Sequence, residues 1–335
     1  MMGLVNLVFD TMADNPNMRE ELSVVCERAL DDLGDQHGAS FDRNRYRQRL
    51  RWELGVASDM GLCTAFLVTG KWTEYIRKGG FLVGPGRGAT AGALIAYLLG
   101  ITQVDPIVHQ LLPERFFYPR KGHPPFYVEV SRTCDARLRR MAAENSVPAE
   151  LVQDVGHHGI GSPRQECAPA CFEDVVAFAS LCGRIPLDSG IAQLCIDVRH
   201  KREEMPIPDV FKPFLAHSWN FPLYVEQIVA IAKEVGAMSP QGAMGMGWSV
   251  FPKLTSAYAR FARLFKAGAS ARGYSTADID CITSLFVVFG PSMFTRAHSV
   301  SHAHITYWTA WLKAHHAEEF GMAPELLAEA PERVH

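Results

Sequence analysis

The glycine-rich run Val83-Gly-Pro-Gly-Arg-Gly-Ala-Thr has the residue types best suited to chemistry. Gly86 and Gly88 lack a Cβ, so the backbone can approach an anion, and the N–H groups at the start of a following helix would face it. Arg87 adds a planar guanidinium that pairs well with phosphate oxygens. The run is neither a Walker loop nor a dinucleotide-binding fingerprint, so taken alone it fits either a phosphate site or a tight turn.

Basic residues gather after this loop. Residues 115–140 contain seven Lys or Arg and two acidic residues, a local charge of +5 in a chain whose net charge is −3. Arg115, Arg120 and Lys121 begin this stretch, which would attract a nucleic-acid backbone in a salt-dependent manner or serve only as solvated surface. Five further arginines alternate between positions 43 and 51, and we predict that they are solvated surface rather than a phosphate contact.

Histidines and cysteines form one pattern that could hold zinc. His157 and His158 precede Cys167 and Cys171, but the spacing departs from the usual pair of close doublets. We therefore do not predict a zinc site.

Residues near the end of the chain follow helical spacing. His298 and His302 are four residues apart without the glutamate of a zinc-protease motif, so we predict packing or a DNA-facing role. Trp308, Trp311 and Leu312 are predicted to lie in the core, as stripes at helical spacing commonly do.

The elements that would position these residues are of two kinds. Apolar spacing predicts helices over residues 16–79, a short strand over 79–84, a buried helix over 89–99 and a strand over 126–130 that alternates in period two. A strand, a glycine loop, a buried helix and a second strand indicate an α/β core. From residue 171 to residue 320 the helical period returns without a convincing sheet.

Composition restricts the class of protein. The 335 residues are 48% hydrophobic and 21% charged, which is typical of a soluble globular chain. The net charge of −3 excludes a protein that coats nucleic acid over its whole surface. The eight scattered cysteines favour a reducing compartment, and the longest apolar stretches are too short to cross a bilayer. We expect a cytoplasmic protein with no membrane partner.

A series of short motifs accompanies the glycine loop in a fixed order: Glu53-Leu, Ala91-Gly-Ala-Leu-Ile-Ala-Tyr, Asp105-Pro, Glu114-Arg-Phe, Pro186-Leu-Asp-Ser-Gly, Tyr224-Val-Glu-Gln-Ile, Ala297-His-Ser and Trp311-Leu-Lys-Ala-His. This series resembles the palm and fingers of the bacterial DNA polymerase III alpha subunit, the family C replicative polymerase. The resemblance implies a truncated, degenerate relative with an α+β fold: a small polymerase-β-like palm, with a short mixed sheet and helices, followed by an all-α fingers-like domain. The domains it implies are an N-terminal helical segment at 1–40, the palm-like domain at 41–140, a linker at 141–170, the fingers-like domain at 171–321 and a tail at 322–335.

The resemblance also places the catalytic positions. In the family, a strand reading Pro-Asp-Phe-Asp-hydrophobic-Asp-Phe supplies two aspartates that hold two Mg²⁺ ions. The strand here is Pro124-Pro-Phe-Tyr-Val-Glu-Val, which puts Tyr127 and Glu129 in those two slots. A tyrosine is neutral at pH 7 and a poor ligand for Mg²⁺, so the resemblance implies a site without its two metal ions.

The remaining binding positions are also partly degenerate. Thr90 stands one residue beyond the family's serine in the glycine loop, and Arg296 keeps one positive charge of the family's Asn-Lys-Ser-His motif. The predicted nucleotide or phosphate site is Gly86, Arg87, Gly88 and Thr90. The predicted DNA contacts are Arg115, Arg120, Lys121, Arg296 and His298.

Three hypotheses follow. The first is an inactive polymerase relative that binds DNA, a deoxynucleoside triphosphate or a replication protein, with no cofactor. The second is a divergent active polymerase that uses Mg²⁺ on Glu129 together with a second carboxylate, drawn from Asp135, Asp154, Glu166 and Glu173. The third is a protein-interaction module without a nucleic-acid role.

Overall fold

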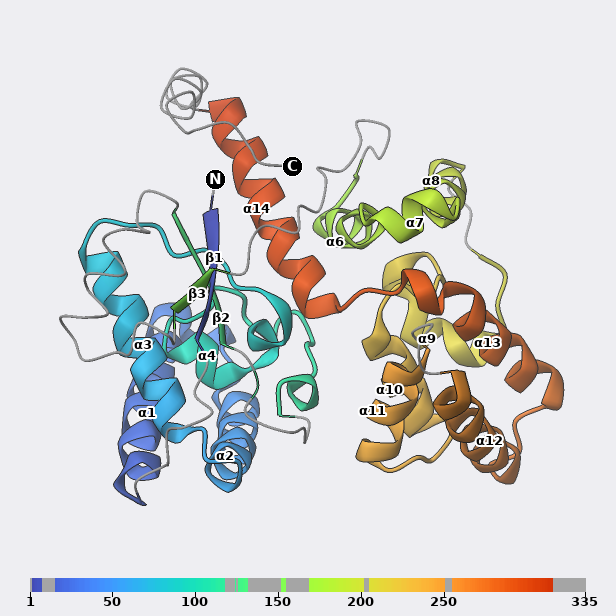
Figure 1. Cartoon of the computed structure of the whole chain (residues 1–335), viewed down its shortest axis with the longest axis horizontal. Coiled ribbons are helices and arrows are strands. Elements are labelled where there is room, and N and C mark those ends of the chain that lie inside the picture. The colour runs from blue at the N-terminus through green and yellow to red at the C-terminus, as the bar shows by residue number, and fades with distance from the viewer. Residues whose placement is uncertain are drawn as a thin grey trace.

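The computed structural model describes residues 2–7, 16–117, 124, 126–131, 152–154, 169–201, 205–250 and 255–315. These residues form a small β-sheet flanked by helices, followed by a helical second half (Figure 1). In the described part of the chain, no helix has the length and apolar character needed to cross a bilayer.

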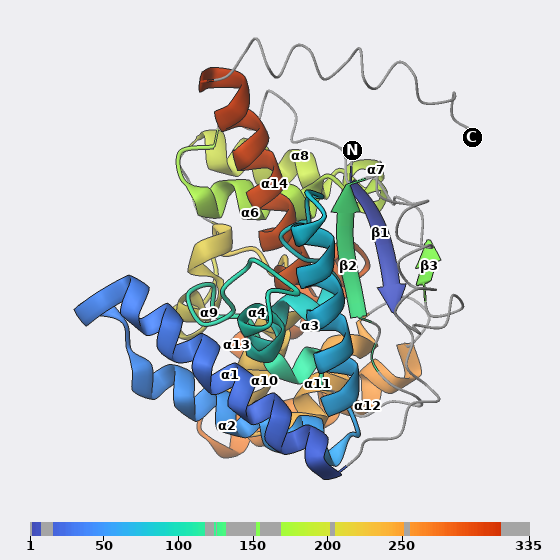
Figure 2. The same ribbon diagram turned by 90° about the vertical axis from the view of Figure 1, so that its left-hand side faces the viewer.

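The first helices confirm the prediction from apolar spacing. They are α1 (Pro16–His37), α2 (Arg43–Asp59) and α3 (Cys63–Lys78). Asp42 accepts a hydrogen bond from the backbone N–H of Arg45 and so caps the start of α2. Figure 2 shows α3 alongside the sheet, with α1 and α2 crossing below it.

The sheet differs from the one expected. Strand β1 (Met2–Leu7) lies between β2 (Phe126–Ser131) and β3 (Val152–Asp154), and both pairs are antiparallel. The described strands do not show the predicted mixed sheet, because both pairs are antiparallel. Strand β1 lies within the segment predicted as helical at 1–40, and β3 lies within the linker predicted at 141–170. The pairing is between segments far apart in sequence, which local periodicity does not report.

Two further expectations near the glycine loop need correction. Residues 79–84 are not a strand, because only Val83 makes a single bridge to Val130. The predicted buried helix is split into the 3₁₀ turn η2 (Gly88–Gly92) and the short helix α4 (Leu94–Leu98), with Ala93 extended between them. The segment is nevertheless buried, as expected.

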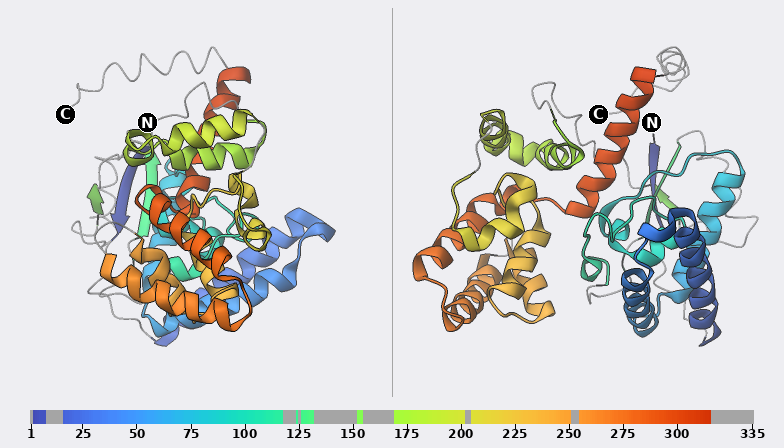
Figure 3. Two further views of the ribbon diagram at one scale, coloured as in Figure 1. Left: turned by 90° about the vertical axis from the view of Figure 1, so that its right-hand side faces the viewer. Right: turned by 180° about the vertical axis from the view of Figure 1, so that it is seen from behind.

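The second half is helical, which confirms the prediction. Its helices are α6 (Phe172–Leu181), α7 (Arg184–Asp188), α8 (Ile191–His200), α9 (Lys212–Leu215), α10 (Val225–Glu234), α11 (Pro240–Ser249), α12 (Thr255–Ala271), α13 (Thr276–Phe289) and α14 (Arg296–His315). Figure 3 shows α10 to α13 gathered on the side away from the sheet.

Two hydrophobic clusters fill the interior. One joins α1, α2, α3 and α4 to β2, and the other joins helices of the second half to Ala91, Val104 and Leu111. Helix α14 lies between the two halves in Figure 1 and packs on both α6 and η2. The prediction that Trp308 and Trp311 belong to the core is wrong, because they are 38% and 44% exposed. The Leu312 side chain lies outside the described residues.

Candidate functional site

The glycine loop is a tight turn held against β2. Gly86 has a φ of +123° and Gly88 a φ of +60°, both in the region that favours glycine. A Cβ on Gly86 would lie 2.8 Å from Thr102, and one on Gly88 would lie 3.0 Å from the Tyr127 ring. The Gly84 N–H donates to the Glu129 carbonyl at 2.7 Å. The two glycines are therefore required by the turn itself.

Arg87 points inward and pairs with Glu129 of β2. Its Nη1 lies 3.4 Å from Glu129 Oε1, and the two side chains are 8% and 3% exposed. The other carboxylate oxygen of Glu129 is buried and accepts no hydrogen bond from the described residues. The cation predicted to bind phosphate thus contacts the carboxylate predicted to bind metal.

The environment of Glu129 disfavours its charge. Burial raises the pKa of this carboxyl from near 4.5 to about 7, and the nearby Arg87 guanidinium only partly offsets the effect. Glu129 therefore titrates near neutral pH.

Tyr127 and Thr90 serve the packing of the loop. Thr90 is fully buried, and its hydroxyl accepts a hydrogen bond from the Tyr127 backbone N–H at 3.3 Å. The Tyr127 ring lies against Gly88. These contacts join η2 to β2, and the phosphate-binding role of Thr90 stays a prediction.

Other basic groups gather beside Arg87. Arg115 of η3 (Pro113–Arg115) stacks 4.3 Å above the Trp248 ring of α11. His298 and His302 of α14 stack on each other with ring centroids 4.5 Å apart. Burial lowers the pKa of His298 well below its usual value, and His302, Arg87 and Arg115 lower it further. The structure thus brings together three of the residues predicted to bind nucleotide or DNA: Arg87, Arg115 and His298.

The side chain of Arg296 contacts a different set of residues from Arg87, Arg115 and His298. Its guanidinium is 10% exposed and bonds to both carboxylate oxygens of Glu173, at 3.0 and 3.1 Å. It also donates to the His109 carbonyl at 3.4 Å and lies over the Tyr224 ring. Arg296 therefore links α14, α6 and the loop of residues 106–110, and its predicted contact with DNA remains a prediction.

A buried glutamate anchors the helix that follows the glycine loop. Glu53 of α2 is fully buried and accepts hydrogen bonds from the Leu94 and Ile95 N–H groups at 2.9 and 3.0 Å. Arg49 donates to the same carboxylate at 2.6 Å and to the Gly92 carbonyl at 2.9 Å. The sequence contains the Glu53-Leu motif but does not predict this role for Glu53. The i, i+4 spacing of Arg49 and Glu53 is the sequence feature that could have indicated an ion pair between them.

Comparison with known proteins connects this site to one family. The family described as "Bacterial DNA polymerase III alpha NTPase domain" matches residues 20–133, and the one described as "Bacterial DNA polymerase III alpha subunit finger domain" matches residues 150–273. The DNA polymerase III subunit alpha of Escherichia coli K12 is 30% identical over 207 residues. The chain is a relative of the bacterial DNA polymerase III alpha subunit.

The similarity to individual alpha subunits is partial. The Escherichia coli match covers 60% of this chain and 18% of that subunit. The alpha subunit of Haemophilus influenzae is 33% identical over 45% of this chain and 14% of its own length. That of Mycobacterium tuberculosis H37Rv is 46% identical over 24% of this chain and 7% of its own length. The chain therefore spans less than a fifth of the length of these relatives.

The described residues of this alpha-subunit relative do not fit a pair of Mg²⁺ ions. Beside the glycine loop, Glu129 already contacts a guanidinium, and Tyr127, the other position that the resemblance implies, has a neutral side chain. Glu173, a candidate second carboxylate, is paired with Arg296. The register pairs Asp154 and Val128 with Val5 but Glu129 with Leu4, so residues 154 and 129 belong to opposite faces of the sheet. Asp135 and Glu166 lie outside the described residues.

The other predicted residues have mixed outcomes. Arg120, Lys121, His157, His158 and Cys167 lie outside the described residues. Cys171 is exposed and makes no disulfide. Within the described ranges, no group of three or more His, Cys, Asp or Glu side chains is placed to hold a metal ion.

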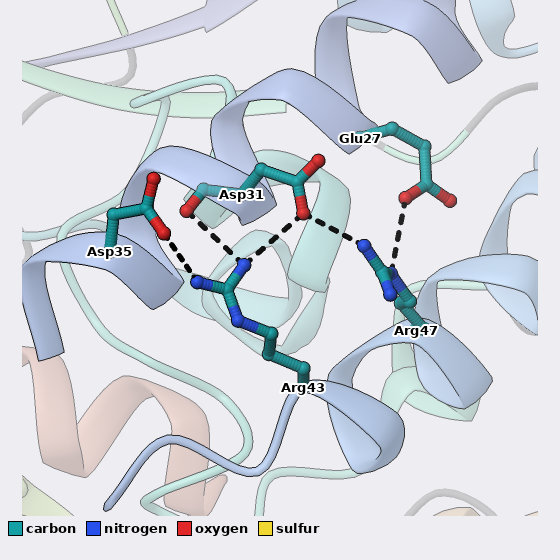
Figure 4. Close-up of polar contacts among 5 residues, drawn as sticks. All are labelled: Glu27, Asp31, Asp35, Arg43 and Arg47. Carbon is teal, nitrogen blue, oxygen red and sulfur yellow. Dashed lines mark hydrogen bonds and ion pairs between the residues drawn. The ribbon is translucent and has the colours of Figure 1, made fainter. Parts of the chain in front are cut away.

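Two of the five alternating arginines of α2 bind acidic residues of α1 in this alpha-subunit relative. Arg43 contacts Asp31 at 3.3 Å and pairs with Asp35, while Arg47 contacts Asp31 at 2.8 Å and Glu27 at 3.7 Å (Figure 4). These pairs are partly exposed, which agrees with the prediction of surface residues for Arg43 and Arg47. They join two helices instead of presenting a phosphate site. The prediction is wrong for Arg49, which is mostly buried beside Glu53.

Proposed function

We propose that this chain acts in DNA replication as an alpha-subunit-like protein that binds DNA or a nucleotide but does not join nucleotides. The observation that carries the proposal is the buried ion pair between Arg87 and Glu129. Glu129 stands in one of the two positions that the family resemblance assigns to metal-binding aspartates. A cytoplasmic location and contacts with replication proteins belong to the same proposal.

The electrostatics of the site favour an anion over a cation. Two-metal phosphoryl transfer needs several carboxylates to hold two ions about 4 Å apart. Here one carboxylate titrates near neutral pH, and the permanently charged group that contacts it is Arg87. A divalent cation would have to displace the Arg87 guanidinium and would be repelled by it. A phosphate group is negatively charged and would instead be attracted by the Arg87 guanidinium.

The catalytic half of the proposal is tested by primer extension. We expect no extension of a primed DNA template with Mg²⁺ or Mn²⁺, because the carboxylate that the resemblance assigns to a metal ion is paired with the Arg87 guanidinium. The Escherichia coli alpha subunit, assayed alongside, is the positive control. Extension by the wild-type chain that disappears in Glu129→Gln would contradict the proposal and favour the divergent active polymerase.

The binding half is tested by the salt dependence of DNA affinity. We expect log affinity for single-stranded DNA to fall linearly with log salt, with a slope of about −0.7 for each phosphate neutralised. Arg115→Gln should reduce the size of that slope by about 0.7, the contribution of one phosphate contact. Lys78→Gln, a change at an exposed α3 lysine paired with Glu74, is the matched control and should leave it unchanged.

Two results would contradict the binding proposal. Affinity that does not respond to salt would exclude phosphate contacts as its source. A complete lack of DNA binding by the wild-type chain would favour the protein-interaction module.

A further inference from the structure

A cavity of about 490 Å³ lies between α2 and the loop of residues 106–114. Its volume is in the range of small-molecule sites, which is about 300 to 1,000 Å³. None of the described residues that the sequence predicts to bind phosphate or DNA belongs to its lining. The cavity is therefore distinct from the candidate site beside the glycine loop.

One side of α2 supplies the polar and aromatic wall of this cavity. Its members are three or four positions apart, so they share one side of the helix: Arg45, Gln48, Arg49 and Trp52. The opposite wall is mostly apolar and consists of prolines, leucines and an isoleucine of the loop. Trp52 is 42% exposed. The cavity thus joins a basic end at Arg45 to an aromatic end at Trp52, about 10 Å apart along the helix axis.

Two guanidinium groups at the cavity retain hydrogen-bond donors for a ligand. Arg45 is exposed, and within the described part of the chain its side chain makes no hydrogen bond or ion pair. Arg49 donates from Nε to Glu53 and from Nη2 to two backbone carbonyls, while its Nη1 bonds to none of the described residues. Planar guanidinium groups pair well with phosphate oxygens.

The charges around the cavity favour an anion. Among the lining residues that the structure describes, Glu114 alone is acidic, and its Oε1 atom lies 3.7 Å from Lys233 Nζ. The charge of Arg49 is balanced by Glu53. Arg45 is left as the uncompensated positive charge, which an anionic ligand would neutralise.

Contacts between the two walls form the cavity before a ligand binds. The Tyr46 hydroxyl of α2 donates to Asp105 Oδ2 at 2.5 Å. Asp105 Oδ1 in turn accepts from the Ile107 and Val108 N–H groups at 2.8 and 3.1 Å. Gln110 has a φ of +53°, which is uncommon for a residue other than glycine and is typical of binding loops. The loop is therefore fixed against α2, which lowers the entropic cost of binding.

We propose that this cavity binds a nucleoside phosphate, with the phosphate at Arg45 and Arg49 and the base stacked on Trp52. Every base has a flat π face that can stack on an indole ring. The amides of Gln48 and Gln110, which also line the cavity, can donate to and accept from the polar edge of a base. The inference goes beyond the proposed function, because it assigns a second site outside the glycine loop.

Simpler ligands would use only part of the cavity. An inorganic phosphate would leave the aromatic end empty, and an uncharged ring would leave Arg45 without a counter-charge. A nucleoside phosphate carries both groups in one small molecule, so it is the ligand that uses both ends.

The test measures the binding of radiolabelled ADP to the full chain by equilibrium dialysis. We expect Arg45→Gln and Trp52→Ala each to weaken binding by about tenfold, because the first removes a charged donor and the second a stacking surface. Arg51→Gln is the matched control, since Arg51 is an exposed arginine of the same helix that does not line the cavity. Its affinity should equal that of the wild type.

Further measurements separate the contributions of the phosphate and the base. Adenosine and inorganic phosphate should each bind at least about tenfold more weakly than ADP, because each lacks one of the two groups. The Trp52 ring also meets the Phe117 ring edge-on, so Trp52→Ala removes a contact within the fold as well. Trp52→Phe keeps a ring that can stack, and its affinity should stay within about threefold of the wild type.

Three results would overturn the inference. Unchanged ADP affinity in Arg45→Gln and Trp52→Ala would exclude this cavity, and a loss in Arg115→Gln alone would then place the nucleotide at the glycine loop and leave the proposed function intact. Inorganic phosphate that binds as tightly as ADP would identify a simple anion site. A lack of ADP binding by the wild type would reject the inference, while the salt dependence of DNA affinity would still test the proposed function independently.

Discussion

Glu53→Ala is expected to destabilise the chain by about 3 to 5 kcal/mol, a large share of the stability of a typical domain. The change leaves the Leu94 and Ile95 N–H groups buried without acceptors, and each such group costs about 1 to 3 kcal/mol. Arg49 also loses its carboxylate partner while remaining mostly buried. The measurement is the denaturant midpoint together with the slope of the unfolding transition.

Two further variants distinguish the loss of the buried hydrogen bonds of Glu53 from a general effect of removing a negative charge. Glu53→Gln keeps one carbonyl oxygen as an acceptor for one backbone N–H. Its amide NH₂ would face the second backbone N–H, so that two donors would oppose each other and the variant should also be less stable than the wild type. Glu74→Ala removes a carboxylate from the exposed pair with Lys78 on α3 and should have no measurable effect. Equal stability of Glu53→Ala and the wild type would mean that Glu53 does not hold the start of α4.

The helices and the family could be predicted from sequence because both depend on local information. The apolar spacing of α1, α2 and α3 is regular, and β2 alternates in period two. The motifs shared with the alpha subunit lie in a fixed order along the chain. Each of these features can be recognised without knowing which distant segment lies beside it.

The sheet could not be predicted because its pairing is non-local. Met2–Leu7 is a short apolar run whose strand character depends on finding β2 more than a hundred residues later. Conversely, residues 79–84 have strand-like composition but pair only through Val83. Hydrogen bonding to a partner, rather than composition, decided both cases.

The same limit applies to the candidate site. Arg87 and Glu129 were each assigned a ligand, a phosphate and a metal ion, because the sequence shows them 42 residues apart. Their mutual contact follows from the antiparallel path of the loop and β2, with Gly84 bonded to the backbone of Glu129. Likewise, Arg296 was assigned to DNA, whereas α6 brings Glu173 to it.

The raised pKa of Glu129 predicts a particular dependence of stability on pH. Because the carboxyl titrates near 4.5 when unfolded and at about 7 when folded, the folded chain holds this proton more tightly. Its contribution to stability is full below about pH 4.5 and is lost as the pH rises toward 7. Between pH 5.5 and 8.0, the wild type should lose about 2 kcal/mol more unfolding free energy than Glu129→Gln, which cannot titrate.

The control for this effect is Asp174, a carboxylate whose pKa is lowered in the folded chain. Hydrogen bonds from Arg199, Ala170 and Trp219 hold the pKa of Asp174 below its usual range despite its burial. Its contribution therefore changes only below about pH 4, and Asp174→Asn should keep the wild-type slope between pH 5.5 and 8.0. If Glu129→Gln also kept that slope, Glu129 would be ionised throughout this interval. The attraction of the Arg87 guanidinium would then outweigh the effect of burial on this carboxyl.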